Sequence, residues 1–389
     1  MGRPEATNGR SPQPSTSLEN RSHSPDSAAP SLGLPGHYYT AQDIFEQELN
    51  TLWRSTWQMV GRVEDIPNAG DYLAVQLGAE PIFVLRQADG NLAAMHNVCP
   101  HRGARLLMGD APNSERLDVP GQCSTKITCP YHAWTFGADG ALLGISQPQQ
   151  FPDLDKSKIH LTAARVETWG GFIFVCPDLE GESLHEYLAD FSSYLEGYHA
   201  PWQDLREVMR WSYVEPVNWK FVVENYVEDY HFSVVHPESL GFYDFRSIET
   251  QLTGRHCEVL IPYMREHLER ESLPHMREKV HLSYQGFIFP NFMVNTEIDH
   301  VSIFRLKPLT PTQTKVEVIL YQTPQQQKQQ PLKRDRLTAS YDQVMEEDFS
   351  VCRLLQEGVH SRAYGVAQFA TERELGISHF HNVIKTYVA

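Results

Sequence analysis

Two short segments that each pair a cysteine with a histidine constrain this chain more than any other feature of its sequence. The first contains Cys99 and His101, and the second contains Cys129 and His132. Each short loop can aim one thiolate and one imidazole at a common point, so the fold has to bring the two loops together. Two thiolates and two imidazoles fit a tetrahedral zinc ion. They also fit a [2Fe–2S] cluster whose cysteines bind one iron and whose histidines bind the other.

The order of these ligands helps to separate the two kinds of site. Zinc sites commonly place two cysteines before two histidines, whereas cysteine and histidine alternate here. Residues 99–106, CPHRGARL, and residues 129–136, CPYHAWTF, resemble the two cluster-binding loops of the Rieske non-haem iron oxygenases. Cytochrome-complex Rieske proteins carry an extra cysteine in each loop, and Ala104 and Tyr131 occupy those positions here. The resemblance therefore implies an oxygenase-type Rieske [2Fe–2S] cluster on the two cysteines and two histidines.

The spacing between the two loops is longer than this family usually shows. Residues 102–128 separate His101 from Cys129, and the extra segment, at about 109–126, is polar and rich in turn residues. We interpret this segment as a loop insertion, because lengthening a surface loop adds little closure entropy. Cys123 lies within it but has no following histidine, so we exclude it as a ligand.

A second group of metal-binding residue types follows later in the chain. His231 and His236 are five residues apart, which on a regular α-helix would turn them about 140° from each other. Both can face one metal only if the predicted helix at about 218–233 ends or unwinds between them, and Pro237 is consistent with a helix end. Within the resemblance, Glu228 and the two histidines match an E/D-x2-H-x4-H motif. Two histidines and one carboxylate leave open positions for O2 and substrate at Fe(II).

The carboxylate ligand is expected from a helix near the end of the chain. In the family, an aspartate before a Gln-x-Gly turn binds the mononuclear iron, and Asp348 occupies that place here. Glu346 and Glu347 are the adjacent alternatives, and each could equally be a residue of a solvated helix face. The resemblance therefore implies a mononuclear Fe(II) site made of His231, His236 and Asp348.

Glu228 is expected to act in catalysis without binding the iron directly. The family uses the carboxylate at this position as a bridge between the iron site and a cluster histidine of the neighbouring subunit, here expected to be His132. Asp229 is the competing residue, but its register is wrong by one. The resemblance thus implies electron transfer between subunits and an oligomer, expected to be a homotrimer. Because no flavin or nicotinamide fingerprint is present, an NAD(P)H-dependent reductase or a ferredoxin has to supply the electrons.

The expected fold class is α+β, with two domains after an N-terminal extension and a helix. Residues 1–36 are rich in Ser, Pro, Asn and Gly, which predicts a disordered extension, and residues 37–56 predict an N-terminal helix. Residues 57–166 show short strands and turns, which predicts an all-β Rieske domain. Residues 167–389 are predicted to form the mononuclear iron domain. That domain is expected to be a helix-grip fold, in which an antiparallel sheet packs against a long C-terminal helix.

Two details of the second domain are predicted from local composition. The periodicity places the long helix at about residues 332–359, where it closes the domain. The Gln-rich stretch at 325–330 is predicted to be a surface loop.

Charge and composition exclude several kinds of partner. The chain has 33 basic and 49 acidic residues and a net charge of −16, which argues against binding nucleic acid or an anionic membrane surface. No apolar run approaches the roughly 18 residues that a membrane-spanning helix requires. The six cysteines are dispersed and no apolar leader is present, so we expect a cytoplasmic protein without a disulfide framework.

The implied activity is O2-dependent oxidation of a small organic molecule. Glu rather than Asp at position 228 resembles the subgroup that acts on choline, glycine betaine and carnitine, so a quaternary ammonium monooxygenase is favoured. An aromatic-ring-hydroxylating dioxygenase, of the kind used in aromatic hydrocarbon catabolism, is the alternative. A Rieske electron carrier is the alternative of another class, but it would leave His231, His236 and Asp348 without a role. Six aromatic residues are candidates for a cation–π cage: Tyr226, Tyr230, Tyr263, Tyr284, Phe292 and Tyr321.

Overall fold

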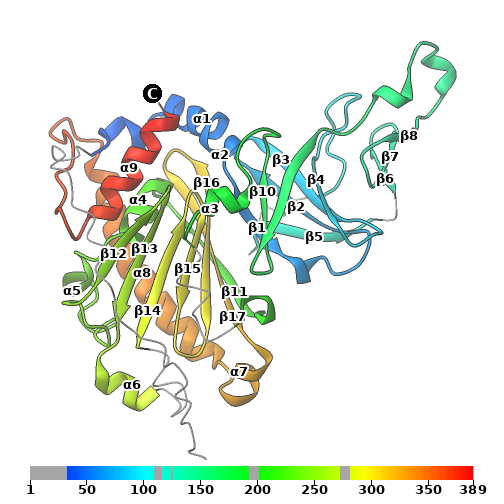
Figure 1. The fold of residues 1–389 in the computed structure, drawn as a ribbon. Helices are drawn as coiled ribbons and strands as arrows, with labels where there is room; N and C mark the ends of the chain where they lie inside the picture. The colour runs from blue at the N-terminus through cyan, green and yellow to red at the C-terminus, as the bar shows by residue number, and fades with distance from the viewer. Residues whose placement is uncertain (1–32, 109–115, 124–125, 192–200, 272–280, 389) are drawn as a thin grey trace, which may run out of the picture.

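The computed structural model describes residues 33–388 except 109–115, 124–125, 192–200 and 272–280. Two seven-stranded sheets dominate this part of the chain, and Figure 1 shows them side by side as separate bodies. The predicted α+β architecture, an all-β domain followed by a sheet with a long helix, is confirmed. The predicted disordered extension at 1–36 lies outside the described residues except for its last four, of which Leu34 is buried in the core of the second domain.

The first sheet is built from the part of the chain that carries the two Cys–His segments. Its strands run in the order β1-β10-β9-β4-β3-β2-β5, and the contacting pairs are antiparallel. A separate three-stranded sheet, β6-β7-β8, continues this domain. The strands are β1 (Gln58–Arg62), β2 (Asp71–Leu77), β3 (Glu80–Arg86), β4 (Leu92–His96), β5 (Asp118–Gln122), β6 (Lys126–Thr128), β7 (Thr135–Gly137), β8 (Leu142–Gly144), β9 (Ala163–Trp169) and β10 (Phe172–Cys176).

Strand β10 lies after the predicted domain boundary at residue 166 and stays with the first sheet. Gly170 and Gly171 both have positive φ and form a tight connection that returns the chain directly onto β9. Every residue of β10 is buried, because the strand contributes alternate side chains to two different cores. The strand therefore joins the two domains as well as completing a sheet.

The second sheet is an antiparallel sheet with helix α8 across one face, as Figure 1 shows. Its order is β11-β17-β16-β15-β14-β13-β12. Met345, Phe349 and Cys352 of α8 lie on one helix face and are buried in the core shared with the sheet. The strands are β11 (Arg206–Glu215), β12 (Glu249–Thr253), β13 (His256–Pro262), β14 (Leu282–Ile288), β15 (Phe292–Thr296), β16 (Val301–Thr310) and β17 (Gln313–Gln322).

The helices differ from the prediction in several places. The N-terminal helix predicted at 37–56 is one 3-10 turn followed by two short α-helices, and the helix at 218–233 is likewise two helices with a break. The Gln-rich stretch is not a loop, because the Thr323 side chain caps a helix there. A further helix at the C-terminus was not predicted. The α-helices are α1 (Gln42–Asn50), α2 (Leu52–Ser55), α3 (Leu184–Leu188), α4 (Trp219–Tyr226), α5 (Phe232–Val235), α6 (Arg265–Glu271), α7 (Pro324–Gln329), α8 (Arg334–Gly358) and α9 (Leu375–Tyr387).

The insertion between the two Cys–His segments, predicted to be a loop, contributes edge strand β5 to the first sheet. Its sequence, with Pro120 and Gly121, has little strand propensity, but Pro is tolerated at a sheet edge. Asp118, at the start of β5, is completely buried among charged residues of both domains. The two residues 124–125 and the start of the insertion lie outside the described part of the chain. The local sequence does not favour a strand here. The strand forms because it pairs with β2 and because Asp118 forms buried ion pairs.

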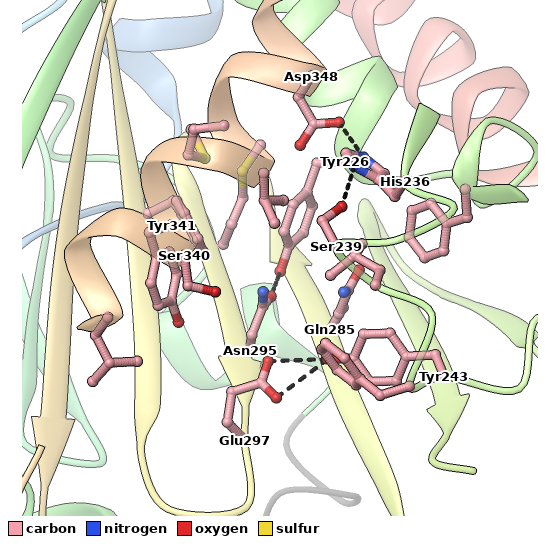
Figure 2. Close-up of a pocket in the computed structure, with 18 of the residues that line it drawn as sticks. Tyr226, His236, Ser239, Tyr243, Gln285, Asn295, Glu297, Ser340, Tyr341 and Asp348 are labelled. Atoms are coloured by element: carbon pink, nitrogen blue, oxygen red, sulfur yellow. Dashed lines mark hydrogen bonds and ion pairs between the residues drawn. The ribbon is translucent and has the colours of Figure 1, made fainter. Parts of the chain in front are cut away.

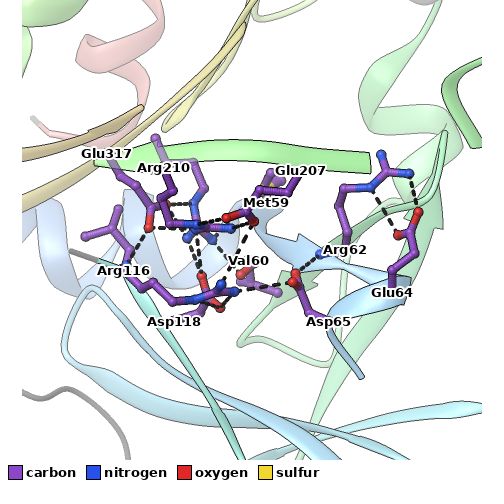
Figure 3. Close-up of polar contacts among 12 residues, drawn as sticks. Met59, Val60, Arg62, Glu64, Asp65, Arg116, Asp118, Glu207, Arg210 and Glu317 are labelled. Carbon is purple, nitrogen blue, oxygen red and sulfur yellow. Dashed lines mark hydrogen bonds and ion pairs between the residues drawn. The ribbon is translucent and has the colours of Figure 1, made fainter. Parts of the chain in front are cut away.

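A buried charge cluster connects the two domains at this point (Figure 3). Asp118 accepts from Arg116 at 2.7 Å and pairs with Arg305 of β16. Glu317 of β17 accepts from Arg305 Nε at 2.6 Å and from Arg210 of β11 at 2.7 Å. Each buried charge in this group thus has at least one opposite partner, as burial of charge requires.

Candidate metal centres

The two Cys–His loops have the same backbone design. In both, the cysteine N–H donates to the carbonyl of the residue five positions later, at 2.8 Å: Cys99 to Ala104 and Cys129 to Trp134. The residue four positions after each cysteine has positive φ, 75° at Gly103 and 56° at Ala133. Glycine adopts this conformation freely, whereas alanine does so at a cost. The repeated turn explains how two different sequences present cysteine and histidine in the same way.

The loops bring their four predicted ligands together. The rings of His101 and His132 lie 4.8 Å apart, centroid to centroid, at 67° to each other, and Trp134 stacks on His101 at 4.7 Å. Both cysteines are buried. Burial is the main cause that raises the pKa of the Cys99 thiol, and the adjacent Cys129 side chain raises it further. The Nδ1 atom of His132 is buried without a hydrogen-bond partner among the described residues. Two cysteines and two histidines, one of them with a buried and unpartnered Nδ1, are the kinds of ligand that a Rieske cluster uses.

A helix break presents the second pair of histidines. Asn218 caps helix α4 by accepting from the Lys220 N–H with its side chain, and the helix ends at Tyr226. The chain then starts the one-turn helix α5, with His231 at its N-cap and His236 at its C-cap. The two rings lie 5.3 Å apart because they sit at the two ends of α5 and do not share a regular helix. The helix end that the spacing required is therefore present.

His231, His236 and Asp348 form one group, in which the potential ligand atoms all lie within 4.8 Å of one another. Asp348 Oδ1 lies 2.8 Å from His236 Nε2 and 3.4 Å from His231 Nε2. Figure 2 shows Asp348 reaching His236 from α8. Both histidines thus turn Nε2 toward the same carboxylate, which leaves Nδ1 on the outside of the group.

Carboxylates also occupy the outer edge of each ring. Glu228 bonds to His231 Nδ1, and Glu347 lies 2.7 Å from His236 Nδ1. Glu346, the other neighbour of Asp348, points away and pairs with Arg353 at the surface. Metal-binding histidines commonly use such a carboxylate to fix the ring orientation. Sequence reasoning identified Glu228 but did not predict its contact with His231, and it considered Glu347 only as a rival ligand.

The charges of this group compensate one another. Burial alone would lower the pKa of His231, but hydrogen bonds with Asp348 and Glu228 raise it to about 9. Burial alone would raise the pKa of Asp348, but its bonds with His231 and His236 lower it. Asp229, the competitor of Glu228, pairs with Arg373 instead. A metal cation can therefore replace the protons that His231, His236 and Asp348 share in these hydrogen bonds.

A cavity of about 400 Å³ opens beside these residues. Its wall contains Tyr226, Tyr243, Tyr263 and Tyr341 together with the carboxylate of Glu297 (Figure 2). Glu297 accepts from Tyr263 at 2.7 Å and from Tyr243 at 3.2 Å, and its pKa is raised by burial.

Only two of the six aromatic residues proposed as a cage line this cavity, namely Tyr226 and Tyr263. Tyr284, Phe292 and Tyr321 are buried in the core shared by the two domains, and Tyr230 is exposed. The prediction was wrong for these four. The candidates Tyr284, Phe292 and Tyr321 lie on strands, where the alternation of side chains, invisible without the sheet, turns them away from the cavity. Tyr230 lies in the turn between α4 and α5 and faces solvent.

Comparison with known proteins identifies both domains. Residues 56–163 match the family described as the Rieske [2Fe-2S] domain, and residues 202–389 match the ring hydroxylating alpha subunit catalytic domain. The chain belongs to the Rieske non-haem iron oxygenases. It is therefore an oxidoreductase whose two domains are those of a [2Fe–2S] cluster and a mononuclear iron, and the electron-carrier alternative does not account for the second domain. Among described residues, no helix is long and apolar enough to cross a membrane.

Several members of this oxygenase family are similar to the chain over most of its length. The carnitine monooxygenase oxygenase subunit of Escherichia coli (strain K12) is 28% identical over 90% of this chain and 92% of its own length. A glycine betaine monooxygenase oxygenase subunit of Pseudomonas aeruginosa (strain UCBPP-PA14) is 34% identical over 57% of this chain and 47% of its own length. A crystal structure of the quaternary ammonium Rieske monooxygenase CntA shares the fold, with a TM-score of 0.77 and 24% identity over 92% of this chain and 96% of that one.

Proposed function

We propose that this oxygenase oxidises a quaternary ammonium compound of the choline, glycine betaine or carnitine type. The observation that carries the proposal is the His231, His236 and Asp348 group at the wall of an aromatic cavity that also holds Glu297. Aromatic faces and a carboxylate both attract an onium cation, which cannot donate a hydrogen bond. The names of the relatives, carnitine and glycine betaine monooxygenase oxygenase subunits, point to the same substrate class.

We assign the two metal centres to the residues that the structure brings together. Cys99, His101, Cys129 and His132 would hold the [2Fe–2S] cluster, and the unpartnered Nδ1 of His132 fits that role. His231, His236 and Asp348 would hold Fe(II) through two imidazoles and a carboxylate. Bound iron supplies O2 activation, and monooxygenation consumes O2, two electrons and two protons to yield hydroxylated substrate and water.

The residues around the iron site would prepare it for this chemistry. Glu228 bonds to His231 Nδ1 and accepts from the Tyr230 N–H, so its buried carboxylate is held in place beside the ring. We propose that it passes electrons to the iron site from His132 of a neighbouring subunit. A quaternary ammonium Rieske monooxygenase of the same fold is described with inter-subunit electron transfer.

Two groups of exposed apolar side chains support a head-to-tail ring, for which the family resemblance implies a homotrimer. The cluster loops and α5 lie on opposite sides of the subunit in Figure 1. Exposed large apolar side chains occur at both places: Met108, Tyr131 and Leu143 near the cluster loops, and Tyr230 and Val234 at α5. A head-to-tail ring of three subunits would cover both surfaces and bring each cluster to the next iron. A separate reductase or ferredoxin would reduce the cluster, in the cytoplasm, where reduced nicotinamide is available.

An aromatic-ring-hydroxylating dioxygenase is the second candidate. The four tyrosines of the cavity wall would also suit the flat face of an aromatic acid. Glu297 is the feature that distinguishes the two candidates, because its carboxylate can pair with an onium group, and an aromatic acid has no cation to offer it.

Peroxide-driven turnover tests the proposal without the reductase. The protein with both metals is mixed with hydrogen peroxide and with choline, glycine betaine, carnitine or benzoate, and products are identified by mass spectrometry and a formaldehyde assay. Trimethylamine, formaldehyde or an aldehyde from an onium substrate is the expected result. A hydroxylated ring from benzoate alone would replace this proposal with the second candidate.

A further inference from the structure

The imidazole of His236 lies between two consecutive residues of helix α8. Asp348 Oδ1 is 2.8 Å from its Nε2, and Glu347 Oε2 is 2.7 Å from its Nδ1. His236 itself is completely buried, so its ring nitrogens need partners within the protein. Glu347 is the nearer partner of Nδ1, because the Ser239 hydroxyl lies farther away, at 3.4 Å. Successive residues of an α-helix point about 100° apart, which allows two neighbours to reach the two edges of one ring.

Glu347 is itself held in place by other side chains. Ser239, three residues after His236, donates its hydroxyl to Glu347 Oε2. Gln343, one turn earlier on α8, donates to Glu347 Oε1 at 3.0 Å. Both carboxylate oxygens are therefore engaged, and the side chain is only about a quarter exposed, at 27%. A carboxylate fixed at both oxygens can fix the ring to which it is bonded.

We propose that Glu347 is a positioning residue for the mononuclear iron site. By accepting the Nδ1–H of His236, it places the lone pair of Nε2 on the side of Asp348 and His231. Without it, the ring can adopt the other tautomer or rotate away. This inference rests on the proposed iron site. It makes Glu347 the second carboxylate, after Glu228, that acts on the site through a histidine. Both histidines of the site then have the same carboxylate support.

The test compares adjacent glutamates on one helix. Glu347→Ala and Glu347→Gln are measured against Glu346→Ala, because Glu346 pairs with Arg353 and is mostly exposed. Fe(II) affinity is measured by equilibrium dialysis, with the visible spectrum of the Rieske cluster as an internal standard for protein. We expect Glu347→Ala to bind Fe(II) about 10- to 100-fold more weakly, with Glu347→Gln between it and the parent. Glu346→Ala should match the parent.

Two further measurements separate the possible failures. The melting temperature of the protein depleted of mononuclear iron should be the same in the parent and in Glu347→Ala. A fall in that temperature that accounts for the lost affinity would overturn the positioning role, and so would parent-like Fe(II) binding by Glu347→Ala. Asp348→Ala is included because iron retained in that variant would refute the iron site itself. Iron lost from Asp348→Ala but retained by Glu347→Ala would refute only the role of Glu347.

Discussion

Replacement of Asp118 by Asn should destabilise the protein and allow its two domains to unfold at different temperatures. Asp118 is completely buried, and three guanidinium groups surround it: Arg305, Arg116 at 2.7 Å and Arg210 at 3.5 Å. Arg305 and Arg210 belong to the catalytic sheet, whereas Asp118 belongs to the insertion of the cluster domain. Asparagine keeps the shape of the side chain but removes its charge, so the three cations lose their shared partner.

Two estimates give the size of the effect. Burial alone would raise the pKa of Asp118, but Arg305, Arg210 and Arg116 lower it to about 2. That value is about two units below the ordinary value, which corresponds to about 2.5 kcal/mol of stability at neutral pH. Removing one member of a buried ion pair costs about 3–5 kcal/mol. We therefore expect a loss of about 3 kcal/mol, which lowers the melting temperature by roughly 6–12 °C.

Scanning calorimetry at pH 7.5 checks this expectation, with the cluster absorbance followed in parallel. Asp178→Asn is the matched control, because the Asp178 side chain forms an exposed ion pair with Arg54, whose loss should cost no more than about 0.5 kcal/mol. In Asp118→Asn we also expect the transition of the cluster domain to move away from that of the catalytic domain. A melting temperature equal to that of the control would show that the buried charges do not couple the domains.

Four further outcomes test the site and the buried charges. Asp348→Ala should reduce the iron content from about three to about two atoms per chain, measured by elemental analysis, while the visible spectrum of the cluster stays unchanged. An unchanged iron content would contradict the assignment of Asp348 as an iron ligand. Glu228→Gln should keep both metals and lose nearly all coupled turnover in an oxygen-consumption assay, and parent-like coupled turnover would exclude the bridge. Glu297→Gln should raise KM for an onium substrate about 10-fold with little change in kcat, by steady-state kinetics; an equal rise for an uncharged substrate would argue against charge recognition. Because the folded-state pKa of Asp118 is about 2 and lies below the ordinary value, its stabilisation is complete above about pH 4 and is lost as the pH falls toward 2. The difference in urea midpoint between the parent and Asp118→Asn should shrink across that window.

The Cys–His pairs and the break between His231 and His236 could be predicted because they depend on short-range spacing, whereas the choice of Asp348, more than a hundred residues away, came from the family resemblance. Cys-x-His and Cys-x2-His restrict each pair to one turn, and the repeated turn with positive φ at Gly103 and Ala133 is local. The five-residue separation of His231 and His236 likewise required a helix break, because no regular helix could turn both toward one metal. In these cases a few residues of sequence determine the geometry that the chemistry uses.

The remaining features depend on contacts between distant segments. Glu346 and Glu347 are indistinguishable in sequence, and only the position of α5 against α8 makes one of them a partner of His236. Strand β5 has a sequence typical of a loop, and its pairing with β2 and its ion pairs come from elsewhere in the chain. The wrong aromatic candidates, such as Tyr284 and Tyr321, lie on strands of the catalytic sheet but face the other side. Local pattern carries no information on any of these choices.

The interface between the two domains, formed by β10 and the buried charges around Asp118, also affects how electrons would reach the iron. Phe172 and Phe174 of β10 pack in the core shared with the catalytic sheet, whereas Ile173 and Val175 pack in the core of the cluster domain. A strand shared in this way holds the cluster loops in a fixed position relative to α5. The loops and α5 are far apart within one subunit (Figure 1), so transfer to a neighbouring subunit requires that this position be reproducible. Apolar residues of the same volume would stabilise the interface at least as well as the buried charges around Asp118. We infer that those charges serve one defined orientation of the domains more than they serve stability.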